Sequence, residues 1–65
     1  MESETTFKFN GDEYKGVFMT GYDNHHYCTV YNNANGQYLG QVKDIYASDK
    51  DAISRLKKFI ELEAV

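Results

Sequence analysis

Before residue 47, apolar and polar residues alternate in short runs that are rich in Tyr, Phe, Val and Thr. Alternation of this kind predicts half-buried β-strands. Glycine and asparagine separate the runs, and the Asn10-Gly11 pair suits the positive φ angles of a type I′ hairpin turn. Two further turns are expected at residues 21–24 and 32–36. The pattern predicts an antiparallel meander with strands over residues 5–10, 13–20, 26–31 and 37–43.

After residue 47 the periodicity becomes helical. In the segment SDKDAISRLKKFIELE, apolar residues recur at the spacing of one helical face. Ser48 is expected to cap the helix, with Asp49 and Asp51 in the first turn, where the helix dipole favours negative charge. The predicted apolar face comprises Ala52, Ile53, Leu56, Phe59 and Ile60.

These elements predict the α+β class: an antiparallel β-meander of four strands, with three as the alternative, and one C-terminal amphipathic helix packed on one face. Residues 1–4 are expected to form a disordered N-terminal tail, and residues 5–65 a single small domain. A chain of 65 residues allows one domain at most, and its 42% hydrophobic content is sufficient for a core.

Alternation of side chains assigns residues to the two faces of the sheet. The tight turn at Asn10-Gly11 places Phe7 and Phe18 on one face, where Gly16 would let the helix approach closely. The loop at 32–36 is expected to pair Val30 with Tyr38 and Cys28 with Gly40. A one-residue slip would invert a strand. The predicted core beneath the helix is Phe7, Phe9, Phe18, Cys28, Val30, Val42, Ile53, Leu56 and Ile60.

The second sheet face would be open to water, because no part of the chain remains to cover it. Its apolar and aromatic residues would form an exposed patch of the kind that often marks a binding surface. The alternative is a half-exposed sheet with ordinary tyrosines, whose hydroxyls are satisfied by water. The candidate binding residues on this face are Tyr27, Tyr31, Met19, Val17, Leu39, Lys8, Lys15 and Lys43.

His25, His26 and Cys28 are the residues with most potential for chemistry. The histidines are adjacent, so on a strand they point to opposite faces and leave fewer ligands together than a metal site needs. Catalysis by Cys28 would require an ionised thiol beside a base, but the predicted register places this thiol in the core. We therefore expect no metal, no cofactor and no enzymatic activity.

The charge distribution leaves two kinds of partner open. A net charge of −3 disfavours a nucleic-acid-binding protein overall, but the lysines and tyrosines of the open face could form a locally basic surface for stacking bases. The predicted function is a non-catalytic binding module that acts in protein–protein interaction or as a homodimer. Nucleic-acid binding by the same face is the alternative, and neither a membrane nor a small-molecule substrate is predicted.

The location predicted from the sequence is cytoplasmic. The single cysteine cannot form an internal disulfide, and the first ten residues, MESETTFKFN, lack the apolar stretch of a secretion signal.

The order of elements ending in SDKDAISRLKKFI resembles the layout of several small domains, including the AP2-like DNA-binding domains of integrases. The likeness covers residues 5–62 and includes no diagnostic motif, so it implies an arrangement and no functional residues.

Overall fold

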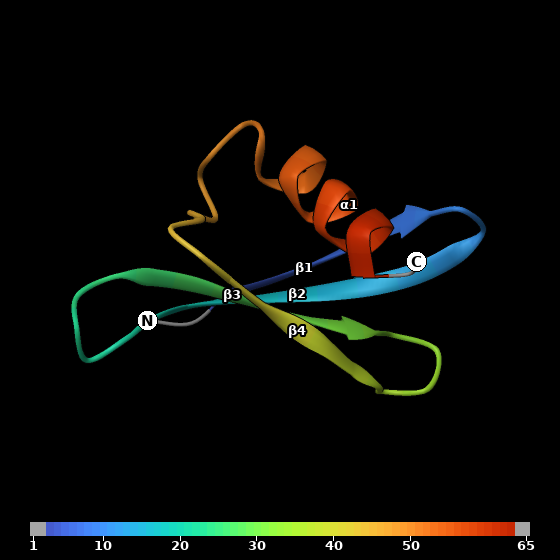
Figure 1. Cartoon of the computed structure of the whole chain (residues 1–65), viewed down its shortest axis with the longest axis horizontal. Helices are drawn as coiled ribbons and strands as arrows, with labels where there is room; N and C mark the ends of the chain where they lie inside the picture. The colour runs from blue at the N-terminus through green and yellow to red at the C-terminus, as the bar shows by residue number, and fades with distance from the viewer. Residues whose placement is uncertain (1–2, 64–65) are drawn as a thin grey trace.

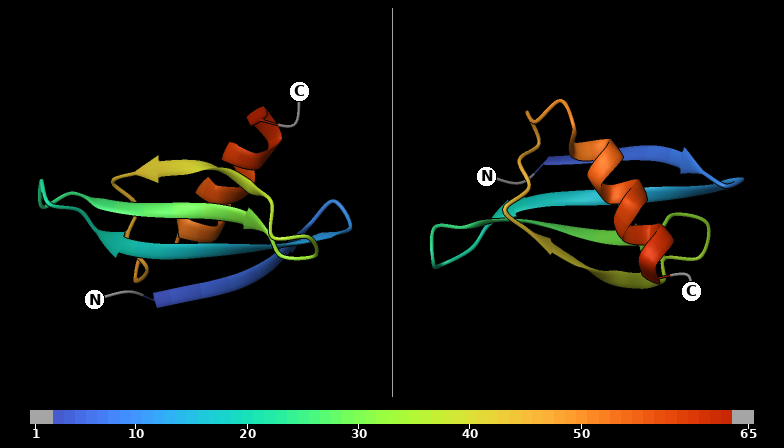
Figure 2. Two further views of the ribbon diagram at one scale, coloured as in Figure 1. Left: turned by 90° about the horizontal axis from the view of Figure 1, so that it is seen from below. Right: turned by 45° about the horizontal axis from the view of Figure 1, so that its top comes forward.

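A computed structural model of the protein describes residues 3–63. The helix α1 (Ala52–Glu63) crosses one face of a single antiparallel sheet, and no element of residues 3–63 covers the other face (Figures 1 and 2). This architecture confirms the predicted α+β meander with four strands. In spatial as in chain order, the strands are β1 (Ser3–Phe9), β2 (Asp12–Thr20), β3 (His26–Asn32) and β4 (Tyr38–Lys43).

The first hairpin has the predicted turn and the predicted register. Asn10 and Gly11 have φ angles of 51° and 85°, as a type I′ turn requires at its two central residues. The turn pairs Phe9 with Asp12, and the pairing then continues without interruption along both strands. The sequence therefore determines the alignment of β1 and β2 through two residues.

β1 begins earlier than predicted. Ser3 pairs with Phe18, and Glu4 pairs with Val17. Both residues were assigned to a disordered tail, and the structure places them in the sheet instead. The reason is that β2 is long enough to supply partners for them. Residues 1 and 2 of the expected tail lie outside the described residues.

The β3–β4 hairpin has a different register from the prediction. Val30 pairs with Gly40 and Cys28 with Val42, two residues from the expected partners. The ladder then shifts, so that Tyr31 pairs with Tyr38.

The shift is a β-bulge, and it exchanges the faces of two residues. An extra residue in one strand changes which way the neighbouring side chains point. Leu39 packs against the buried cluster, so its predicted place on the open face is wrong. Tyr38, predicted for the covered face, lies beside Tyr31 on the open one.

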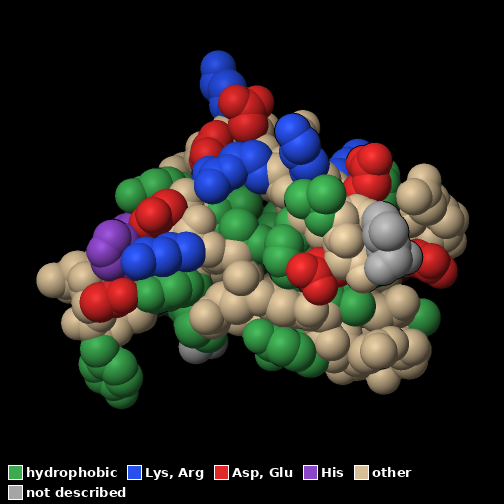
Figure 3. Space-filling model, viewed as in Figure 1, with side chains coloured by type: hydrophobic (Ala, Val, Ile, Leu, Met, Phe, Trp, Pro, Cys, Tyr) green, Lys and Arg blue, Asp and Glu red, His purple; other side chains and the backbone are tan. Residues whose placement is uncertain are grey.

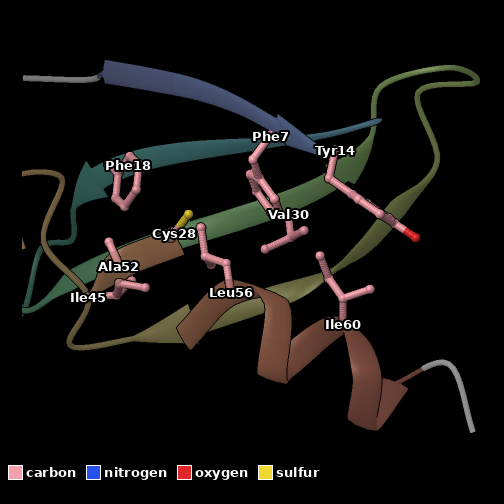
Figure 4. Packing of buried hydrophobic residues seen from close by; sticks show 9 residues of the cluster. All are labelled: Phe7, Tyr14, Phe18, Cys28, Val30, Ile45, Ala52, Leu56 and Ile60. Atoms are coloured by element: carbon pink, nitrogen blue, oxygen red, sulfur yellow. The ribbon is translucent and has the colours of Figure 1, made fainter. Parts of the chain in front are cut away.

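The core fills the space between the sheet and α1 (Figure 4). Phe9, Val42 and Ile53, which were predicted as core, are only partly buried at its margin. Ile45 was missed because it lies in the connector after β4, outside any periodic element. The buried set is Phe7, Tyr14, Phe18, Cys28, Val30, Ile45, Ala52, Leu56 and Ile60.

The helix starts at Ala52, so the predicted cap at Ser48 is wrong. The Arg55 amide donates to the Asp51 carbonyl, which is the first hydrogen bond of the helix. The Asp49 carboxylate in turn accepts from the Asp51 amide at 2.9 Å. Asp49 and Asp51 therefore shape the approach to the helix and do not belong to its first turn.

Gly16 lets the helix approach the sheet, as predicted. A β-carbon on Gly16 would lie 3.0 Å from the Cys28 sulfur and 3.2 Å from Cδ1 of Leu56. Both neighbours are fully buried and cannot move aside easily. A side chain at this position would therefore force the helix away from the sheet.

We expect Gly16→Ala to lower the free energy of unfolding by about 1–3 kcal/mol, the usual cost of overpacking a core. Urea denaturation followed by circular dichroism measures the change. In a Cys28→Ala background the same substitution should cost less, because removal of the sulfur makes room for the new methyl group. Strictly additive effects of the two substitutions would contradict this account of Gly16.

Candidate binding surface on the open sheet face

The open face carries every predicted site residue except Leu39. Helix α1 crosses one side of the sheet (Figure 2). Alternation along the observed register puts these side chains on the other side. We use "open face" for this surface. Its members are Glu4, Thr6, Lys8, Glu13, Lys15, Val17, Met19, Tyr27, Thr29, Tyr31, Tyr38, Gln41 and Lys43.

An aromatic cluster lies on the open face near the β3–β4 loop. The rings of Tyr31 and Tyr38 meet edge to face, with centroids 5.9 Å apart. The Lys15 ammonium lies 5.6 Å from the centroid of Tyr31, close enough for a cation–π interaction. Tyr31 is half-buried between these neighbours, whereas Tyr38 is 59% exposed. Sequence reasoning missed Tyr38 because only the bulge brings it to this face.

The middle of the open face is polar. Thr29 is buried between its cross-strand neighbours Val17 and Gln41. The Gln41 amide donates to the Thr29 hydroxyl at 3.4 Å. Val17 and Met19 are half-buried, so their exposed area is limited. The aromatic cluster at Tyr31 is thus the most exposed apolar part of the face.

Tyr27 serves the β2–β3 loop. Its hydroxyl donates to the Asp23 carboxylate, and its ring covers Gly21 so closely that a β-carbon there would lie 2.6 Å from the ring. The hydrogen bond from Tyr27, helped by the amide of His25, lowers the pKa of the Asp23 carboxyl. The same bond raises the pKa of the Tyr27 hydroxyl. Tyr27 therefore has a local structural task, and its hydroxyl is already engaged.

We expect Tyr27→Phe to raise the pKa of Asp23 toward the ordinary value of an aspartate, because the carboxylate loses its main hydrogen-bond donor. An NMR titration of the side-chain carbonyl carbon measures this pKa. Tyr22→Phe is the matched control, since Tyr22 is fully exposed in the same loop. An unchanged pKa of Asp23 in Tyr27→Phe would show that the hydrogen bond does not form in solution.

The charge of the open face is nearly balanced. Its basic residues are Lys8, Lys15 and Lys43. Its acidic residues are Glu13 and Glu4, and Glu4 was predicted to belong to the disordered tail. The other basic residues belong to the helix and the segment before it, and Figure 3 shows basic side chains gathered over α1. The open face is therefore less basic than expected, because Glu4 adds a second acid to it.

His25 lies in the loop just before β3, so only His26 belongs to the sheet, with its side chain on the covered side. Nδ1 of His25 lies 2.9 Å from the Asp44 carboxylate at the margin of the open face. The His26 ring packs against Tyr46 on the covered side, with centroids 4.3 Å apart. Within residues 3–63, no group of three or more His, Cys, Asp or Glu side chains is placed to hold a metal ion.

Cys28 is enclosed by the core. Its side chain has no exposed surface, and burial raises the pKa of its thiol to about 11. At neutral pH the thiol is therefore protonated, whereas the thiolate is the form that reacts as a nucleophile. The protonation state of the Cys28 thiol and its lack of exposed surface both argue against a role as a catalytic nucleophile.

The Cys28 thiol should be almost inert toward Ellman's reagent in the native protein at pH 8. It should react at the rate of an ordinary free thiol once guanidinium unfolds the chain, because both burial and the raised pKa are then lost. The release of the coloured thiolate measures both rates. Rapid labelling of the native protein would mean that the core around Cys28 opens readily.

The described part of the chain contains no helix long and apolar enough to cross a membrane. Comparison with known proteins gives no match, whether to a family model, to a curated protein or to a solved structure. The function must therefore be inferred from the surface itself.

Proposed function

We propose that the protein is a non-catalytic binding module whose open face binds another protein molecule, either a different protein or a second copy of the chain. The observation that carries this proposal is the Tyr31–Tyr38 cluster on a sheet face that no element of residues 3–63 covers. Tyrosine is enriched at the centres of protein interfaces, where a large ring can be buried and its hydroxyl can still form a hydrogen bond. The predicted cytoplasmic location is part of the same proposal.

The geometry favours Tyr38 as the principal contact. Tyr31 is already held between Lys15 and Tyr38, so it presents only part of its ring. Tyr38 is the more exposed of the pair. A partner that covers both rings therefore removes more of the Tyr38 surface from water. The pair is also preorganised, because the edge-to-face contact restricts both rings before a partner arrives.

Binding of single-stranded nucleic acid by the same face is the alternative function. The two tyrosine rings could stack bases, and the three lysines of the face could contact phosphates. Glu4 and Glu13 oppose this function because they repel a phosphate backbone. The two functions differ in salt dependence, since nucleic-acid affinity falls steeply as salt is raised.

Tyr38→Asp should weaken binding of the protein partner by roughly thirtyfold, the loss of about 2 kcal/mol that is usual for a central tyrosine. Tyr22→Asp is the matched control: it makes the same change at a fully exposed tyrosine in the β2–β3 loop. Affinity capture from cells that express the protein, quantified by mass spectrometry, compares the two variants with the wild type. Solution mass at several concentrations reports self-association.

Equal partner recovery by Tyr38→Asp, Tyr31→Asp and the wild type would refute binding through the open face. Binding of an oligothymidine that disappears between low and physiological salt, and depends on Tyr38, would favour the nucleic-acid function. Urea denaturation of each variant separates loss of binding from loss of the fold.

A further inference from the structure

The free edge of β1 is a regular surface for strand pairing. The type I′ turn joins Phe9 and Asp12 as a hydrogen-bonded pair, and such pairs recur at every second position of an antiparallel ladder. The residues between them, Glu4, Thr6 and Lys8, therefore direct their amides and carbonyls away from β2. No element of residues 3–63 lies beyond this edge (Figure 2).

The opposite edge of the sheet is much less suitable. β4 (Tyr38–Lys43) is shorter than β1 and contains the irregular step at the bulge. Helix α1 also packs over this strand, where the Phe59 ring lies against Gly40. Bulges and short strands are common means of preventing strand addition at a sheet edge. The two edges thus differ in kind.

Two opposite charges on β1 lie at equal distances on either side of its midpoint. Thr6 is the middle residue of Ser3–Phe9, with Glu4 two residues before it and Lys8 two residues after it. If two copies of β1 pair antiparallel about Thr6, each Glu4 lies directly opposite Lys8 of the second copy. Opposite charges at directly paired positions stabilise an antiparallel sheet.

We propose that two copies of the chain associate through their β1 edges, antiparallel and centred on Thr6, and so join their four-stranded sheets into one continuous sheet. Sliding the pairing by two residues would oppose Thr6 to Glu4 or to Lys8 and lose both charge pairs. Sliding it by one residue would misalign the outward backbone groups. The centred register is the only one that satisfies the backbone and both charges.

Charged residues on an edge strand ordinarily discourage pairing, and this is the simplest role for Glu4 and Lys8. Their symmetry about Thr6 gives them a second effect. They repel or fail to match most other strands, but a second copy of β1 neutralises both charges. The same residues therefore select the chain itself as the partner.

The covered side of the edge also suits a second copy. A groove of about 290 Å³ runs beside the start of β1, lined by Ser3, Thr5 and Ile53 among others. In the centred register Ser3 lies opposite Phe9 of the second copy, and Thr5 lies opposite its Phe7. Phe9 is only partly buried in one copy, so the pairing gives its ring a place at this groove.

The dimer would extend the open face without using it. A two-fold axis that passes between the two Thr6 residues, perpendicular to the sheet, keeps both helices on one side and both open faces on the other. The inference does not rest on the proposed function, because the edge and the Tyr31–Tyr38 cluster are separate surfaces. Tyr38 lies on β4, at the far edge of each sheet.

Charge exchange tests the register. Glu4→Lys and Lys8→Glu each place like charges opposite one another in both pairs, and each should raise the homodimer dissociation constant by about tenfold, or about 1.4 kcal/mol. An equimolar mixture of the two variants restores both attractive pairs, and should form a heterodimer close to wild-type affinity. Sedimentation equilibrium at low salt measures all three constants.

A matched control separates the register from general charge attraction. Glu61→Lys and Lys58→Glu make the same charge changes on exposed positions of α1, and their mixture should gain no affinity. Lys8 also pairs with Glu13 in its own chain, so the stability of Lys8→Glu is measured separately by urea denaturation.

Thr6→Pro tests the edge itself. Proline removes an amide that points away from β2, so the β1–β2 ladder should persist while the dimer is lost. An NMR spectrum that retains the β2 and β3 signals establishes that the fold is intact. A wild-type protein that stays monomeric up to millimolar concentration would overturn the proposal. So would a dimer that tolerates Thr6→Pro and both charge changes but is broken by Tyr38→Asp, because it would use the open face.

Discussion

The contact of one helix with one face of the sheet is the constraint on which the other features depend. Gly16 and Gly40 leave room for Leu56 and Phe59, so α1 lies directly on the backbone of β2 and β4. A helix of twelve residues is about 18 Å long, enough to cross the sheet once. Within residues 3–63, the helix therefore shields only one face of the sheet from water. Cys28, on the helix side, is sealed into the core, and the tyrosines on the other side must meet water or a partner.

Much of this arrangement could be predicted from the sequence, because short-range signals determine it. Asn10-Gly11 sets the register of the first hairpin, and the spacing of Leu56 and Ile60 identifies the buried face of the helix. Leu39 and Tyr38 could not be assigned correctly, because a bulge adds one residue to a strand without any distinctive turn residue to mark it. The residues of the open face were consequently predicted correctly except on β4, where Leu39 was included and Tyr38 was omitted.

The stretch with both histidines and the cysteine illustrates how backbone geometry limits chemistry. Its reactive groups are near in sequence, but His25 lies in the loop before β3, whereas His26 and Cys28 point to the covered side of the sheet. His25 stands beside Asp44 at the surface, and His26 packs on Tyr46. Tyr27, which appeared to be a free binding residue, holds the adjacent loop through Asp23. The aromatic residues left for recognition are Tyr31 and Tyr38, near the β3–β4 loop.

The bulge in β4 has a consequence for assembly as well as for the face that Tyr38 occupies. A sheet with two equivalent free edges can add copies without limit, which is how fibrils grow. In this chain one edge is regular and the other is bulged and overlain by the helix. Copies joined at β1 would expose only β4 edges at both ends. Growth would therefore terminate at two chains, and the irregular strand would act as a stop against polymerisation.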